Sequence, residues 1–171
     1  MPSKVYNNVE DYRLIDNGRA VEDVQNVSLP TITRTSTSID AAGMVAAVDV
    51  PSSYHVDAMD FSVAHNNGVN CQQLSAPGQH TMEFRIARQR YNVIVGDFEY
   101  ESVKYRVVGV HKSTDQGSVE RGNPLGSTEN YSVLRFEKEV GGEVVTLIDA
   151  RTGDNRSNGV DYASPVQSLL N

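Results

Sequence analysis

Three polar residues that lie close together in the sequence have the side chains that metal and acid–base sites use. His55, Asp57 and Asp60 could in principle form such a site. Because side chains alternate between the two faces of a strand, His55 and Asp57 share one face and Asp60 points to the other. The same parity separates His80 from Glu83. We therefore expect solvated residues near strand ends here, and no catalytic or metal site.

Cys71 is the only cysteine and the first candidate for a nucleophile. No catalytic signature surrounds it, and a lone cysteine on a short helix more often packs as a small apolar residue. A single cysteine also excludes an intrachain disulfide and a cysteine-based metal site. Ser53, Ser113 and Ser118 lack the elbow motif of hydrolases, and Gly141-Gly142 lacks the lysine and following helix of a phosphate-binding loop. We expect no catalytic residue and no cofactor.

An acidic row offers the last candidate site. Asp97, Glu99 and Glu101 alternate along one predicted strand, so their carboxylates share a face. Such a row could bind a hard cation, but an acidic face exposed to water is the more common outcome.

The composition indicates one domain, covering residues 1–171, with a thin hydrophobic core. Hydrophobic residues make up 39% of the chain and there is no tryptophan. We expect such a domain to bury part of its surface against neighbours. An ordinary small β protein with a polar surface fits the composition as well.

The charge pattern argues against a protein that binds nucleic acids through electrostatic attraction. The formal net charge is −7, and lysine and arginine do not cluster. The N-terminal residues lack the basic and apolar regions of a secretory signal, and no apolar run approaches the length of a membrane span. We expect the chain to be made, and to stay soluble, in a cytoplasm.

Alternating apolar and polar residues predict a series of antiparallel strands. A first hairpin turns at Asn17-Gly18, because this dipeptide readily adopts the positive φ angles of a two-residue turn. A last hairpin turns at Gly141-Gly142. Further strands are predicted at residues 56–65, 80–90, 98–111, 131–140 and 144–149.

Breaks in this alternation predict the remaining features. Residues 69–76 favour a short helix with Val69, Gln72, Gln73 and Ala76 on one face. The register slip at Val107-Val108 predicts a bulge near Gly109. Residues 113–129 are polar and turn-rich, which is typical of a mobile loop, and Pro165 suits the start of a helical turn.

Residues 24–51 form the most informative stretch of the chain. Small and β-branched residues build two extended segments, hinged at Ala41-Ala42-Gly43, without a core face of their own. We expect residues 31–50 to be a long hairpin that contacts neighbouring subunits. The candidate interface residues are Thr31, Thr33, Thr35, Thr37, Ala42, Gly43, Met44 and Val48.

Several motifs in this stretch and beyond it carry a family resemblance. Leu29-Pro30 closes a strand, an Ala42-Gly43-Met44 hinge follows, and Val48-Asp49-Val50 comes next. Near the C-terminus, Leu147-Ile148-Asp149 precedes Asn158-Gly159-Val160-Asp161. In this order and spacing the motifs resemble the major tail tube proteins of contractile-tailed phages and R-type tailocins. The middle of the chain, residues 97–127, matches no family motif.

The resemblance implies a fold, an assembly and partners. The expected fold is mainly β: an antiparallel β-sandwich or open barrel with a long hairpin and one short flanking helix. Six copies would form a ring whose strands join into one continuous barrel, and rings would stack into a hollow conduit for DNA ejection. The expected partners are further copies of the chain, the tail sheath, the baseplate and the tail terminator, and the expected location is the virion tail.

Two alternatives remain open at this point. A type VI secretion tube protein would share the architecture, and a small β-sandwich enzyme or ligand-binding domain would share the strand pattern. Within the tube reading, the candidates for residues facing the lumen are Ser36, Ser38, Asp97, Glu99 and Glu101.

Overall fold

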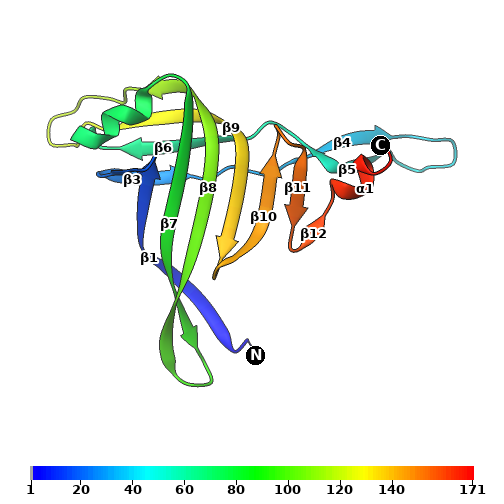
Figure 1. Cartoon of the computed structure of the whole chain (residues 1–171), viewed down its shortest axis with the longest axis horizontal. Helices are drawn as coiled ribbons and strands as arrows, with labels where there is room; N and C mark the ends of the chain where they lie inside the picture. Colours follow the sequence, from blue (N-terminus) through cyan, green and yellow to red (C-terminus); the bar gives the residue numbers. More distant parts are fainter. Residues whose placement is uncertain (1) are drawn as a thin grey trace.

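A computed structural model describes residues 2–171 and shows a mainly β, antiparallel fold, as predicted (Figure 1). The main sheet has the strand order β12-β11-β10-β9-β8-β7-β1-β2, and β3 and β6 join it through β9. The strands are β1 (Lys4–Asp16), β2 (Arg19–Val21), β3 (Val24–Ser28), β4 (Arg34–Ile39), β5 (Val48–Val56), β6 (Asp60–His65), β7 (Gln79–Asn92), β8 (Asp97–Asp115), β9 (Ser127–Val140), β10 (Glu143–Asp149), β11 (Asp154–Ser157) and β12 (Val160–Asp161). A 3₁₀ helix, η1 (Val69–Ser75), and one helical turn, α1 (Ser164–Gln167), complete the chain.

The long strand β9 connects the two layers of the fold. Its first half pairs with β6, and its second half pairs with β10. In Figure 1, β3, β6 and the start of β9 lie across the upper ends of β1, β7 and β8. The core fills the space that this arrangement encloses.

Aromatic rings from both layers form the centre of the core. Phe61 of β6 stacks on Tyr131 of β9 with ring centroids 4.7 Å apart and meets Phe84 of β7 edge-on at 6.4 Å. All three are almost completely buried. Burying a side chain of this size contributes about 1.5–3 kcal/mol. The remaining buried members of this cluster are Leu14, Val21, Met59, Val63, Cys71, Leu74, Met82, Val107, Phe136 and Ile148.

The predicted turns and the predicted bulge are confirmed. Asn17 and Gly18 have φ angles of 48° and 82° between β1 and β2. The register of β8 against β9 shifts between Val108 and Gly109. A Cβ at Gly109 would lie 2.7 Å from the Phe61 ring. The bulge therefore requires glycine, because any side chain at this position would clash with the core.

The prediction of a short helix is right in place but wrong in the face that it buries. Residues 69–75 form a 3₁₀ helix that buries Cys71 and Leu74, whereas Val69 is 90% exposed. A 3₁₀ helix has three residues per turn, so residues three apart share a face. The α-helical spacing used for the prediction therefore selected the wrong residues.

Several predicted boundaries also move. The strand predicted at residues 56–65 is interrupted at residues 57–59, and the loop predicted at residues 113–129 shrinks to residues 116–126. Two strands, β11 and β12, and the first half of β1 had no predicted counterpart, whereas β3 is the strand that Leu29-Pro30 was expected to close. Within residues 2–171, no helix has the length and apolar character needed to cross a membrane.

Candidate assembly surfaces

The predicted hairpin forms a sheet of its own. Among residues 2–171, β4 pairs only with β5, and this two-stranded sheet projects from one end of the molecule in Figure 1. All eight candidate interface residues are exposed. Thr31 and Thr33 precede β4, and Ala42, Gly43 and Met44 lie in the loop of residues 40–47 that connects the two strands.

The register gives the hairpin two different faces. Thr37 pairs with Val50 and Ile39 pairs with Val48, so these four β-branched side chains share one face. Ser38 pairs with Asp49 and Ser36 with Pro51 on the other face. Ile39, Val48 and Val50 are each 45–49% exposed. The hairpin is thus amphipathic, but nothing in residues 2–171 covers its apolar face.

The base of the hairpin is anchored to the body of the molecule. Arg34 donates to the Ser53 carbonyl at 2.7 Å and lies over the Tyr162 ring at 5.1 Å. Asn155 of β11 donates to the Tyr54 carbonyl at 2.8 Å. These contacts occupy Arg34 within its own chain and fix the direction in which the hairpin leaves the sheet.

At the other end of the main sheet, strand edges lie unpaired. β2 pairs with β1 only at Leu14–Asp16, which leaves the preceding residues of β1 without a neighbour on that side. Within the described part of the chain, β3 pairs only with β6. An apolar slot of about 280 Å³ lies between β1 and β3, and the residues that line it are Val9, Tyr12, Gln25, Asn26, Val27, Leu29, Phe84 and Ile86.

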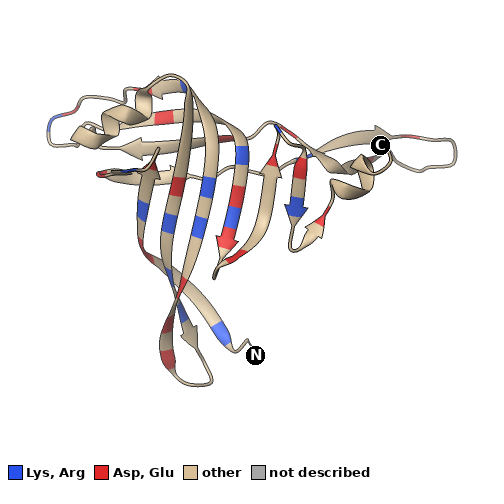
Figure 2. Ribbon diagram, viewed as in Figure 1, with Lys and Arg blue, Asp and Glu red and all other residues tan. Residues whose placement is uncertain are grey.

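The face of the main sheet opposite the core carries charges that pair across the strands (Figure 2). Arg106 of β8 bridges Glu83 of β7 and Glu137 of β9, and Arg135 continues the row to Asp149 of β10. A hydrogen bond from Arg151 is the main cause that holds the pKa of Asp149 below its usual value. This face is polar and nearly balanced in charge.

Two of the three acids in the row predicted from the sequence are also paired, whereas Asp97 accepts only from the Phe98 amide at 2.7 Å among residues 2–171. Glu101 contacts both Arg88 and Arg90 of the neighbouring strand β7. Glu99 accepts from Asn92 and Arg90, each at 2.8 Å, and from Lys4 at 3.0 Å. These donors lower the pKa of Glu99 to about 2, with Asn92 the largest cause.

This pairing predicts a loss of stability in acid. The pKa values of Glu83, Glu99 and Asp149 are lowered in the folded state. Their contribution is therefore present above the unfolded pKa values, near 4, and is lost as the pH falls towards the folded values. We expect the melting temperature to drop between about pH 4.5 and pH 2. Glu99→Gln should flatten this dependence, whereas an equal slope in the variant and the parent would contradict the assignment.

Buried polar residues form two clusters that the sequence did not reveal. His65 and His111 both contact Glu129, at 3.4 and 2.8 Å, and the Glu129 side chain is 2% exposed. His80 contacts Asp16 at 3.0 Å, and its other ring nitrogen lies 2.7 Å from the Ala76 carbonyl. His65 and Glu129 lie 64 residues apart in the sequence, as do His80 and Asp16, so no local motif indicates either contact.

His80 and the neighbouring Tyr131 hold the end of η1 against the sheet. His80 donates to the Ala76 carbonyl, and the Tyr131 hydroxyl donates to the Leu74 carbonyl at 2.6 Å. Both carbonyls lie at the C-terminal end of η1, where helical carbonyls lack partners within the helix. Asp16 and His80 are at most 2% exposed, so the arrangement serves packing and offers no open site.

The other residues considered for chemistry are dispersed. Asp57 accepts from Thr35 at 2.7 Å, while Asp60 pairs with Lys112 at 3.1 Å. The Cys71 thiol is buried and donates to the Glu22 carbonyl at 2.8 Å, and burial raises its pKa. Among residues 2–171, no group of three histidine, cysteine or acidic side chains is placed to hold a metal ion.

Comparisons with known proteins agree with this architecture. A search of curated proteins gave no match. Among solved structures, the fold resembles a chain of the PVC sheath–tube complex of an extracellular contractile injection system, in the extended state, with a TM-score of 0.54 at 9% sequence identity. The match covers 77% of this chain and 90% of that chain. The family model of the phage tail tube protein FII matches residues 8–170. The chain therefore belongs to the phage tail tube protein FII family.

Proposed function

We propose that this protein is the structural subunit of a hollow tail tube, in which rings of six copies stack into a conduit. The observation that carries the proposal is the β4–β5 hairpin, whose apolar face has no cover in its own chain. An exposed amphipathic hairpin and unpaired strand edges are aggregation hazards in a monomer. A closed ring removes both hazards at once.

The dimensions of such a ring suit a conduit for DNA. If each of six subunits contributes four strands, a barrel of roughly 24 strands at ~4.8 Å spacing and ~40° tilt has a backbone diameter of about 48 Å. Side chains on each wall narrow the opening, and a lumen remains that admits a B-form duplex.

The charge of the ring favours sliding of DNA over binding. Six copies at −7 give a formal charge of −42 per ring. A lumen of this sign repels phosphates and avoids the counterion-release contacts that hold DNA on basic surfaces. The polar hairpin face with Ser36 and Ser38 suits such a lining, as does a surface of paired acids such as Glu99 and Glu101.

The proposed partners are the other components of a contractile tail. The sheath would surround the tube, the baseplate and the terminator would cap its ends, and the tube would be located in the virion tail after assembly in the host cytoplasm. The subunit would have no catalytic role, because the histidines and acids of its two polar clusters are buried and serve packing.

Assembly of the purified chain tests this proposal. We expect a species that grows with protein concentration in size-exclusion chromatography, and hollow tubes with six-fold rings in negative-stain micrographs. A chain that stays monomeric at every concentration, and also fails to assemble on isolated baseplates, would overturn the proposal.

A DNA-free particle is the second candidate, favoured by the resemblance to a chain from an extracellular contractile injection system. The subunit would have the same role in either particle. Purified native particles would separate the two, because nuclease-resistant DNA is expected only in a phage.

A further inference from the structure

We propose that strand β5 of one subunit adds to the free edge of β1 in the next subunit and lays its apolar face into the slot between β1 and β3. This inference rests on the proposed tube and names the contact that closes its rings. The partner is a second copy of this chain.

The accepting surface has the features of a strand-addition site. An incoming strand at the free edge of β1 would find backbone groups that no other strand pairs among residues 2–171, and such groups give affinity in this mode of recognition. The Tyr12 amide, which donates to the Asp11 carboxylate at 2.8 Å within the subunit, would exchange that bond for one to the incoming strand. Val9, 54% exposed, and Tyr12 lie on the slot side of β1, and Val27 and Leu29 lie across from them. Two β-bulges make β1 irregular, which disfavours indiscriminate pairing and favours a specific partner.

The donating surface matches this site on its apolar side. Val48 and Val50 of β5 point to the same face, and no strand in the described residues pairs with β5 on the edge away from β4. Side chains two residues apart on a strand suit pockets that line one side of a sheet edge. The two valines of the hairpin would thus extend the apolar, core-facing side of the neighbouring subunit's main sheet.

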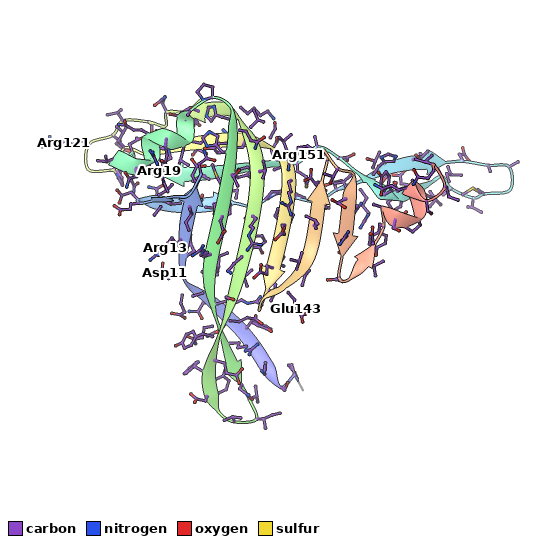
Figure 3. The ribbon with its side chains drawn as sticks, in the orientation of Figure 1. Asp11, Arg13, Arg19, Arg121, Glu143 and Arg151 are labelled. Atoms are coloured by element: carbon purple, nitrogen blue, oxygen red, sulfur yellow. The ribbon has the colours of Figure 1, made fainter. Side chains whose placement is uncertain are left out.

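Charge matches on the opposite side. Arg13 lies on the face of β1 opposite the buried Leu14 and has no acidic partner within 4.0 Å among residues 2–171. Asp49 lies between Val48 and Val50 on the polar face of β5 and is likewise unpaired in the described chain. Figure 3 shows Arg13 at the outer edge of β1. When β5 extends the sheet with its apolar face inward, Asp49 comes to the face that carries Arg13.

The two surfaces cannot meet within one subunit. β4 and β5 project from one end of the molecule, and β1 and β3 lie at the other (Figure 1). A contact between two different surfaces of identical subunits is head-to-tail, and such contacts form rings when the rotation closes. This is the geometry that the proposed tube requires.

Crosslinking between defined pairs tests the contact directly. In assembled tubes of the Val9→Cys/Val50→Cys variant, a short bismaleimide should give a ladder of covalent oligomers that ends at the ring size. The buried Cys71 thiol should not react. The control is Val160→Cys/Val50→Cys, because Val160 lies on β12 at the opposite edge of the sheet and is 50% exposed. A ladder from the control pair but not from the Val9 pair would overturn the inference.

Matched substitutions test the two faces separately. Val50→Asn should raise the concentration needed for assembly at least tenfold, whereas Ser38→Asn, on the polar face, should change it less than twofold. Arg13→Glu should weaken assembly, and Asp49→Arg in the same chain should restore it. Equal effects of the two asparagine variants, or no rescue by Asp49→Arg, would contradict the contact. If the wild-type chain forms tubes but the variants contradict the contact, the proposed function stands and only the contact is wrong. If the wild-type chain forms no tubes, the proposed function itself is overturned.

Discussion

Replacing residues 37–50 by Asn-Gly is expected to abolish tube formation while the subunit stays folded. The new turn would connect Ser36 directly to Pro51, which are neighbours across the β4–β5 ladder. Every residue in the deleted segment is exposed, so its removal takes no side chain from the core. Asn-Gly supplies the positive φ angles that a two-residue hairpin turn needs.

The measurement combines assembly with stability. We expect the variant to remain monomeric at concentrations at which the parent forms tubes, and to unfold within a few degrees of the parent. Tubes of normal appearance from the shortened chain would show that the hairpin is dispensable. A large fall in the melting temperature would show that the hairpin supports the fold of its own subunit.

Hydrogen exchange of the intact chain provides a test without a mutation. Among residues 2–171, the amides of β4 and of the distal part of β5, residues 48–50, that point away from the hairpin ladder have no strand partner, whereas the amides of Tyr54 and His55 donate to the Ser52 hydroxyl. The amides without a strand partner should exchange quickly in the monomer and slowly in the tube, since strand addition would give them carbonyl partners. Equal protection in both forms would contradict a subunit contact at this hairpin.

Local sequence signals predicted the parts of this fold that depend on neighbouring residues. Asn17-Gly18 and Gly141-Gly142 identify turns by their backbone freedom, and both have positive φ angles. Alternation around Phe84 gave the buried face of β7, and the broken alternation at Val107-Val108 indicated the bulge at Gly109. In each case the physical cause lies within a few residues of the signal.

Other features depend on residues far apart in the chain and could not be predicted in this way. The strands β11 and β12 are only four and two residues long, too short for an alternation pattern. The contacts of His65 with Glu129 and of His80 with Asp16 exist only because the fold brings distant strands together.

The pairing of the acidic row, by contrast, was accessible from the sequence. Glu99 and Glu101 follow a tight turn, and Arg88 and Arg90 precede it with the same alternation. Oppositely charged residues at equal distances from a hairpin turn become cross-strand neighbours. The register of that hairpin therefore predicts ion pairs for Glu99 and Glu101 and not a free acidic face.

The buried pair of Asp16 and His80 leads to the largest expected loss of subunit stability. Asp16→Ala should lower the free energy of unfolding by about 3–5 kcal/mol, because it leaves Nδ1 of the buried His80 ring without a polar partner. The Asp16 side chain is 1% exposed, so water cannot easily replace the carboxylate. His80 also holds the end of η1 through Ala76, so η1 should loosen in the variant.

The matched control is Asp11→Ala on the same strand, where the side chain is exposed and the change in the free energy of unfolding should stay within about 0.5 kcal/mol.

The pH dependence of stability adds a second readout. Burial raises the pKa of Asp16, so its contribution to stability is present below the unfolded pKa and is lost as the pH rises through the folded pKa. Asp16→Asn cannot ionise and should lack this part of the pH profile, while its side-chain amide can still hydrogen-bond the His80 ring. Denaturant unfolding at several pH values measures both effects, and a loss in Asp16→Ala no larger than in Asp11→Ala would mean that the buried pair contributes little to holding η1 on the sheet.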